Sequence, residues 1–311
     1  MKRRDFIKSI GAAAAISVLS HGTSNAFSHK NGTNSPPYYE IQDSVPHTPF
    51  CIIFNSTGNL VVTDPSLYRI FLLDYDLKVI NSFGKPGSAP GAFNFPKGVA
   101  VDSKNFVYVV DSNNCRIQIF DPEGKLYKVV GSIGSIAGMF ATPQGICLDS
   151  KDRMFVADTR NHRIQVFESF ELVSVIGDLG DGDSQFRLPT ASQVTPSGEI
   201  MVLDSKHGLV KVFDKDGNFE RSFAGEGNET GRLNSPQGMI LDHDGSLLVA
   251  DTGNHRLQKF DSIGKPMDFP TVDSNGDLLF KTPTSLAVRN ENLYVADSGK
   301  GAVIKLGLKN L

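Results

Sequence analysis

Pairs of aspartate and arginine recur along the chain at a spacing that could support acid–base chemistry. Asp111 and Arg116 are five residues apart, and so are Asp158 and Arg163. A carboxylate held beside a guanidinium can orient a substrate or help to move a proton. An enzyme normally has one active site, however, whereas this pair occurs more than once. We therefore expect these residues to form ion pairs that brace a repeated loop.

Two further groups of side chains could bind metal ions. His162, His207 and His255 occur in similar contexts, and three histidines form a common zinc ligand set. The acidic segment from Asp178 to Asp183 offers the carboxylate and backbone oxygens that Ca²⁺ prefers. That segment lacks the terminal glutamate of an EF-hand loop and lies in a glycine-rich connection. The sequence therefore leaves a calcium site there open.

The recurring aspartates reveal how the chain is organised. Each one ends a short apolar run, and successive copies are 46 or 47 residues apart: Asp64, Asp111, Asp158, Asp204, Asp251 and Asp297. A constant period of about 20 to 50 residues is typical of a chain built from copies of one supersecondary unit. The sequence therefore predicts six such units.

Each unit has the pattern of four short strands. In the second unit, strand-like runs at 99–101, 106–110, 116–120 and 126–130, the third of alternating character, are separated by turns rich in Asp, Asn, Gly and Pro. This pattern predicts an antiparallel meander. A lone sheet cannot bury both of its faces, so the six sheets must pack face to face, and radial closure leaves few open edges. The predicted fold is all-β, a six-bladed β-propeller of four-stranded antiparallel blades.

The last unit lacks one strand of its own. Its third strand, at residues 303–306, lies almost at the C-terminal residue, Leu311. The fourth strand must then come from elsewhere, and the segment from Tyr38 to Ile41 lies just before the first unit. We expect this N-terminal strand to close the last blade, so that residues 38–311 form a single domain.

Two segments carry a specific resemblance. Residues 156–167 (VADTRNHRIQVF) and 249–260 (VADTGNHRLQKF) resemble NHL repeats. The resemblance spans about residues 45–306 and implies a six-bladed propeller that serves as an interaction or sensing module. Leu209 and Ala302 replace the arginine in the fourth and sixth units, and Tyr68 replaces the histidine in the first. These departures predict weaker hydrogen bonding in the corresponding loops.

A ring of six blades makes a shared histidine site unfavourable. Equivalent points on adjacent blades are separated by about their distance from the axis, which is roughly 10 Å or more for a loop beyond the second strand. Zinc requires ligand nitrogens within about 2.1 Å. His162, His207 and His255 should therefore not converge, and, apart from the calcium site left open at Asp178–Asp183, the sequence predicts neither a metal nor a cofactor.

The axial channel is the place where we expect a ligand. The residue after each opening proline should face the channel mouth, which predicts a ligand-binding ring of Phe50, Lys97, Gln144, Thr190, Gln237 and Thr284. This ring contains one cation and neither carboxylate nor imidazole. NHL-like peptidyl-amidoglycolate lyases have histidine ligands near these positions, and lactonase propellers have an acidic metal cage, so we assign no catalytic residue. A channel that holds only water is the alternative.

The N-terminal segment resembles a twin-arginine export signal. Arg3 and Arg4 lie in a basic region, residues 10–19 are mildly apolar, and Ser24-Asn25-Ala26 fits a cleavage site. We expect a signal peptide at 1–26, a flexible leader at 27–37, export by the twin-arginine translocase, and a periplasmic or secreted location. The apolar stretch is about half of the ~20 residues needed to cross a bilayer. Stable membrane insertion is therefore not expected, although retention of the signal as an anchor stays open.

Charge and cysteine content narrow the class of partner. Without residues 1–26, the chain has 27 basic and 33 acidic side chains, and such an acidic exported domain is not expected to bind nucleic acid. Cys51, Cys115 and Cys147 are odd in number and form no CxxC pattern, which favours free buried thiols.

These features favour a monomeric, non-catalytic binding or scaffold module. Its partner would be a periplasmic protein or a small ligand, held on the face formed by the inter-blade loops and by the loops of His162 and His255. The alternative is a lyase or hydrolase with its site at the mouth of the axial channel.

Overall fold

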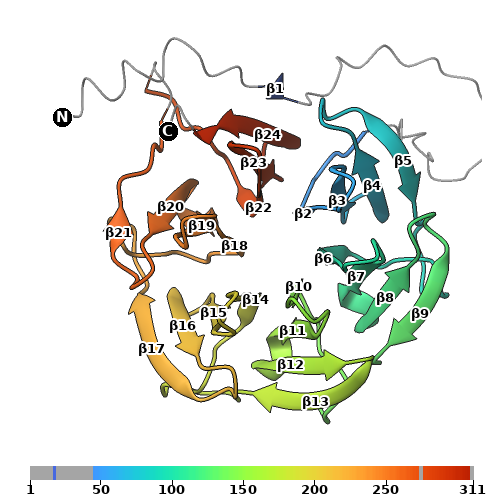
Figure 1. The fold of residues 1–311 in the computed structure, drawn as a ribbon, viewed down its shortest axis with the longest axis horizontal. Coiled ribbons are helices and arrows are strands. Elements are labelled where there is room, and N and C mark those ends of the chain that lie inside the picture. Colours follow the sequence, from blue (N-terminus) through green and yellow to red (C-terminus); the bar gives the residue numbers. More distant parts are fainter. Residues whose placement is uncertain (1–16, 19–44, 273–275, 309–311) are drawn as a thin grey trace, which may run out of the picture.

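Six four-stranded antiparallel sheets form a ring around a central axis (Figure 1). The structure is a computed structural model that describes residues 17–18, 45–272 and 276–308. The predicted all-β, six-bladed propeller is confirmed. The described residues contain no helix that is both long enough and apolar enough to cross a lipid bilayer.

Within each blade, the first strand lies nearest to the axis and the fourth lies at the periphery (Figure 1). Blade 1 comprises β2 (Cys51–Phe54), β3 (Leu60–Asp64), β4 (Arg69–Leu73) and β5 (Val79–Phe83). Blade 2 comprises β6 (Pro96–Val101), β7 (Val107–Asp111), β8 (Arg116–Phe120) and β9 (Leu126–Val130). Blade 3 comprises β10 (Ile146–Leu148), β11 (Met154–Asp158), β12 (Arg163–Glu168) and β13 (Glu171–Ile176).

The second half of the ring repeats this order. Blade 4 comprises β14 (Pro189–Val194), β15 (Ile200–Asp204), β16 (Leu209–Phe213) and β17 (Phe219–Ala224). Blade 5 comprises β18 (Gly238–Leu241), β19 (Leu247–Asp251), β20 (Arg256–Phe260) and β21 (Pro266–Met267). Blade 6 comprises β22 (Pro283–Arg289), β23 (Asn292–Asp297), β24 (Ala302–Gly307) and β1 (Ser17–Val18). Short 3₁₀ helices follow the second strand in blades 2, 3 and 5: η1 (Ser112–Asn114), η2 (Thr159–Asn161) and η3 (Thr252–Asn254).

The core is shared between adjacent blades. Tyr108 and Val110 of blade 2 pack in one cluster with Met154 and Val156 of blade 3. At or next to its last residue, each third strand carries a large side chain that the structure buries: Leu73, Phe120, Phe167, Phe213, Phe260 and Leu306. Since the sheets are apolar on both faces, each blade becomes stable only when a neighbour covers it.

The sixth blade is closed by an N-terminal strand, as expected, but the residues that pair there were not anticipated. In β1, Ser17 and Val18 pair with Lys305 and Ile304 of β24. The segment from Tyr38 to Ile41, which the sequence placed at this edge, lies outside the described residues. The observed edge strand falls within the segment expected to be an export signal.

Candidate functional site

The repeated Asp–Arg pairs form buried clusters that hold the loops between blades. Asp111, Asp158 and Asp251 face Arg116, Arg163 and Arg256 across the second and third strands. In blade 3, the Arg163 Nε atom donates to the Asp158 carboxylate at 2.9 Å, and Asp158 is fully buried. The same carboxylate accepts hydrogen bonds from Asn161, Gln165 and the Ala141 backbone N–H. The predicted bracing role is therefore confirmed.

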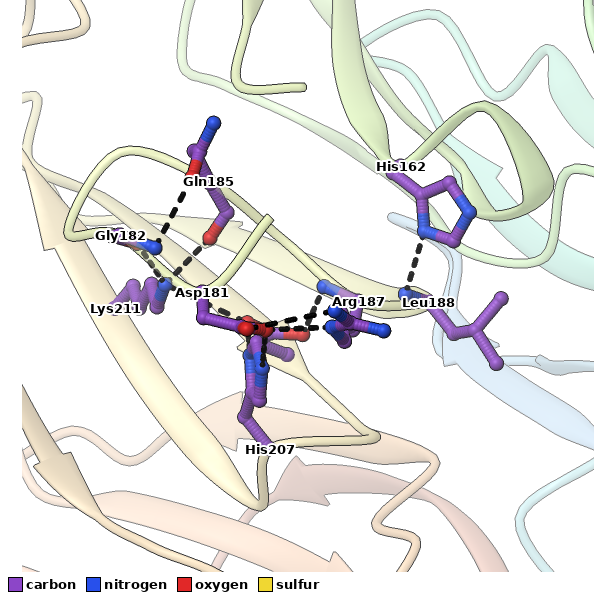
Figure 2. A network of polar contacts seen from close by, with 9 residues as sticks. His162, Asp181, Gly182, Gln185, Arg187, Leu188, His207 and Lys211 are labelled. Atoms are coloured by element: carbon purple, nitrogen blue, oxygen red, sulfur yellow. Dashed lines mark hydrogen bonds and ion pairs between the residues drawn. The ribbon is translucent and has the colours of Figure 1, made fainter. Parts of the chain in front are cut away.

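Blade 4 lacks the arginine but keeps the aspartate paired. His207 Nδ1 is 2.7 Å from Asp204 Oδ2, and Lys211 Nζ is 3.6 Å from the same oxygen. Lys211 takes the position of the glutamine of the other clusters, and its ammonium also donates to backbone carbonyls of the preceding loop (Figure 2). Among the described residues, the Asp204 carboxylate accepts two hydrogen bonds, from His207 and the Arg187 N–H, whereas that of Asp158 accepts four. Hydrogen bonding in this unit is therefore weaker, as expected, although Lys211 keeps an ion pair with the aspartate.

The three histidines do not face one another. His162 Nδ1 accepts a hydrogen bond from the Leu188 backbone N–H at 3.1 Å, while His207 lies between two carboxylates (Figure 2). His255 Nδ1 lies 2.5 Å from the Lys281 carbonyl oxygen. His162 and His255 thus link their own blade to the entry loop of the next one.

The acidic loop before blade 4 is occupied by protein contacts. Asp181 accepts from Arg187 Nε at 2.5 Å and lies 3.0 Å from His207 Nε2 (Figure 2). These two contacts lower the pKa of the Asp181 carboxyl, the hydrogen bond from Arg187 being the larger cause. Within the described ranges, no cluster of three or more His, Cys, Asp or Glu side chains has the arrangement needed to hold a metal ion.

The axial channel contains most of the predicted ring. A cavity of about 290 Å³ between the innermost strands is lined by five of the six ring residues: Phe50, Gln144, Thr190, Gln237 and Thr284. The sixth, Lys97, contacts this lining by a hydrogen bond to the Gln144 side chain. Below this mouth, most of the lining side chains are apolar, among them Ile53, Val101, Leu148, Ile240 and Val288, and the polar ones are Ser192, Gln193 and Ser285.

The six ring residues have different roles. The hydroxyl of Thr284 donates to the Phe50 carbonyl at 2.7 Å, and that of Thr190 donates to the Pro236 carbonyl at 3.1 Å. Both threonines are buried, so their hydroxyls join neighbouring blades. Among the six ring residues, the polar groups that a ligand could reach are therefore those of Lys97, Gln144 and Gln237, with Phe50 as an aromatic wall.

Lys97 is the cation of the mouth, and aromatic rings surround it. Its Nζ donates to Gln144 Oε1 at 2.9 Å and lies 5.1 Å from the centroid of Phe50 and 5.8 Å from that of Phe95. Burial lowers the pKa of the Lys97 ammonium to about 8. Phe95 was missed by sequence reasoning. The available signal was its place in the sequence: Phe95 directly precedes the opening proline, and the ring residue Lys97 directly follows that proline.

Replacing Lys97 should make the protein more stable at neutral pH. The pKa of Lys97 is about 8 in the folded protein, below the value of about 10.4 for an exposed lysine. Below pH 8 the folded state carries the whole cost of burying the charge, and this cost disappears as the pH rises towards 10.4. We expect Lys97→Met to raise the free energy of unfolding by about 1–2 kcal/mol at pH 7.

Urea denaturation of both proteins at pH 7 and pH 10 measures this effect. The gain should shrink at pH 10, where the wild-type lysine is mostly neutral in the folded state. A gain of equal size at both pH values would contradict a charge-burial cost.

The cysteines contact the next blade, Cys51 and Cys147 from innermost strands and Cys115 from the loop after η1. All three cysteines are free; Cys115 and Cys147 are buried and Cys51 is half-buried. Cys147 Sγ lies 3.3 Å from Ser192 Oγ, and burial raises the pKa of its thiol to about 12. The cysteines therefore serve packing between blades.

Comparisons with known proteins agree with this architecture. The NHL repeat family model matches residues 93–120, 140–167 and 233–260, which lie in blades 2, 3 and 5. Protein brain tumor of Drosophila melanogaster is 29% identical over 121 residues, which cover 38% of this chain and 11% of that protein. The chain therefore spans about a tenth of the length of this curated relative.

Solved structures share the fold at low sequence identity. A streptogramin B lyase structure has a TM-score of 0.64 and 13% identity, over 86% of this chain and 95% of the lyase. A gluconolactonase from Xanthomonas campestris has a TM-score of 0.64 and 14% identity, over 85% of this chain and 87% of that enzyme. Such identities support the fold alone. Together with the three matched segments, they show that this chain is a six-bladed β-propeller carrying NHL repeats.

Proposed function

We propose that this protein is an exported, non-catalytic propeller that binds a small organic anion at the mouth of its axial channel. The observation that carries the proposal is the Lys97 ammonium, whose one side-chain acceptor among the described residues is the neutral Gln144 oxygen. The ammonium contacts Gln144, a lining residue of the channel, whose deeper lining is largely apolar. This combination suits a carboxylate attached to an apolar body.

The electrostatics of the mouth support an anionic ligand. Transfer of an unpaired charge out of water is costly unless an opposite charge or several hydrogen bonds compensate it. Lys97 has three N–H donors, and Gln144 accepts one of them. The described residues that line the channel include no aspartate, glutamate or histidine. A bound carboxylate would supply the missing acceptor and the missing charge together.

Hexanoate is a suitable probe because it combines a carboxylate with a short apolar chain. Calorimetric titration at pH 7 should detect hexanoate binding, whereas hexanamide and hexylamine should bind at least about tenfold more weakly, since they lack the negative charge. Hexanoate affinity should fall about tenfold or more between pH 7 and pH 9.5, because the Lys97 ammonium, with its pKa of about 8, loses its proton. Equal binding of hexanoate and hexanamide, or no binding at all, would contradict the proposal.

Catalysis at the mouth is the competing function. The same fold occurs in a streptogramin B lyase and in a gluconolactonase. A lysine whose pKa is about 8 can also act as a general base. The Lys97→Arg variant distinguishes the two functions, because arginine keeps the positive charge but cannot release its proton. Binding requires only the positive charge, so a Lys97→Arg variant that keeps its hexanoate affinity supports the binding function. If the wild type hydrolyses a lactone and the Lys97→Arg variant does not, the result supports an enzyme.

Export and protein partners are further parts of the proposal. The paired Arg3 and Arg4 support transport by the twin-arginine translocase to the periplasm. Cell fractionation, with N-terminal sequencing of the mature chain, tests this route, and Arg3→Lys combined with Arg4→Lys should retain the protein in the cytoplasm. A protein partner would bind the face that carries the inter-blade loops.

A further inference from the structure

A second cavity lies on the face opposite the channel mouth, between blades 2 and 3. It has a volume of about 290 Å³. The turn after β6, the turn after β10 and the β12–β13 hairpin surround it, and side chains of β7 and β9 contribute to its wall. We refer to it as the blade 2–3 pocket. Its volume is at the lower end of the range of about 300–1,000 Å³ seen for small-molecule sites.

Four aromatic rings converge in this pocket. The centroids of Phe106 and Tyr127 are 5.1 Å apart, and Phe170 lies 6.3 Å from both Tyr108 and Tyr127. Tyr127 is 61% exposed, which leaves its ring available to a ligand. These rings form a partly open aromatic wall rather than part of the closed core.

The repeat itself does not require an aromatic residue at Phe106. The residue five positions before the recurring aspartate is polar in each of the other five blades: Asn59, Arg153, Glu199, Ser246 and Asn292. Phe106 is half-buried and faces the pocket. Blade 2 therefore departs from the pattern at a position where the fold accepts a polar side chain.

Phe170 is also unusual, because it lies in a shortened and strained turn. Phe167 pairs with Leu172, whereas Phe120 pairs with Leu126 one residue further along. The turn residues Ser169 and Phe170 have φ values of +50° and +71°. Bulky residues rarely adopt this left-handed conformation, which costs about 1–2 kcal/mol. The shortened turn places the Phe170 ring against Tyr108 and Tyr127.

Polar groups of both charges surround the aromatic wall. Lys104, Lys151 and Glu168 line the pocket, are exposed, and make no side-chain ion pair with the other described residues. The Asp102 carboxylate accepts from the Tyr108 hydroxyl at 3.2 Å, and Asp152 accepts from Ser103. The pocket therefore offers both donors and acceptors without a strong excess of either charge.

We propose that the blade 2–3 pocket binds a saccharide, with a sugar ring stacked on the exposed ring of Tyr127. The apolar C–H face of a pyranose fits an aromatic ring, while its hydroxyls can both donate and accept hydrogen bonds. Lys104 and Glu168 are placed to bond such hydroxyls from the rim. The site is separate from the channel mouth and does not depend on the function proposed there.

The mixed lining disfavours ligands of other classes. A phosphate group would meet the carboxylates of Asp102, Asp152 and Glu168. A quaternary ammonium ligand would meet Lys104 and Lys151, and Lys128 already lies 4.6 Å from the Phe170 centroid. A purely apolar ligand would leave the charged groups without partners. A neutral ligand rich in hydroxyl groups meets none of these penalties.

Saturation-transfer NMR with three probes tests the site: cellobiose, maltotriose and N,N′-diacetylchitobiose. We expect transfer to the ring C–H protons of at least one probe at millimolar concentration. Phe106→Asn and Tyr127→Ala should each weaken that binding about three- to tenfold, and the double variant should abolish it. Asn is the residue that blades 1 and 6 carry at this position, so Phe106→Asn should fold.

Ile80→Ala is the matched control. Ile80 occupies, in blade 1, the strand position that Tyr127 occupies in blade 2, and it is 51% exposed. This variant should bind the saccharide as the wild type does. Lack of transfer from all three probes, or transfer that survives the double variant, overturns the proposal. Tighter binding of tetramethylammonium at the same residues overturns the saccharide class. Hexanoate titration of the double variant reports on the channel mouth separately, so the two proposals can fail independently.

Discussion

Replacing Asp158 by alanine should lower the free energy of unfolding by about 3–5 kcal/mol, a cost typical of breaking a buried charge pair. Asp158 is fully buried, and its carboxylate accepts from Arg163, Asn161, Gln165 and the Ala141 N–H. Without the carboxylate, the Arg163 charge has no anionic partner among the described residues, and three other donors each lose one acceptor, although Asn161 and Gln165 keep a backbone carbonyl. Because this cluster joins the loop before blade 3 to its second and third strands, the effect should extend beyond one side chain.

Guanidinium denaturation of Asp158→Ala and wild type provides the measurement. Asp216→Ala is the control, because the Lys215–Asp216 pair is largely exposed, with 69% and 65% of the two side chains accessible, and exposed pairs contribute little. If Asp158→Ala lowered the free energy of unfolding by less than about 1 kcal/mol, contacts other than those of Asp158 would be the ones that stabilise this loop.

The second large effect is expected at the glycines where innermost strands meet. A Cβ atom at Gly145 would lie 2.3 Å from the Thr190 carbonyl oxygen and 2.9 Å from the Ala191 Cα of the next blade. Gly98 and Gly238 would meet the carbonyls of Gln144 and Thr284 in the same way, at 2.5 and 2.4 Å. Gly145→Val should therefore cost about 3 kcal/mol or more, since the obstacle is backbone that can move only with its blade.

Thermal unfolding followed by circular dichroism compares Gly145→Val with Gly182→Ala. A Cβ atom at Gly182 would meet only the flexible Gln185 side chain, at 3.1 Å, so that variant should unfold close to the wild-type temperature. If Gly145→Val unfolded at the wild-type temperature, adjacent blades would have to be able to move apart without loss of packing.

The period of the aspartates was sufficient to predict the fold, because each blade repeats the same strands and turns. The pairing of Asp158 with Arg163 also followed from the sequence, since both residues flank one loop. The ring at the mouth was predictable as a set of positions. The separate roles within it were not, because they depend on where each side chain meets the next blade. Thr284 shows this: its hydroxyl bonds the Phe50 carbonyl, 234 residues away along the chain.

Two other features depended on contacts that sequence spacing does not encode. The fourth blade keeps Asp204 paired through His207 and Lys211, which lie three and seven residues further along rather than five. The blade 2–3 pocket combines Phe106 with Phe170, and only the face-to-face packing of two blades brings them together. A comparison of the six units position by position would have identified Phe106 as an exception, but not its neighbours.

The junction between blades 6 and 1 shows how far the closed ring depends on its N-terminal edge strand. On its inner side, Thr284 donates to the Phe50 carbonyl, and the Ile52 N–H donates to Ser285 Oγ at 3.2 Å. Further out, Tyr294 meets Phe54 edge-on, with centroids 4.9 Å apart. These contacts do not involve β1. Loss of β1 would therefore leave these contacts between blades 6 and 1 in place, and they hold the ring closed without the edge strand.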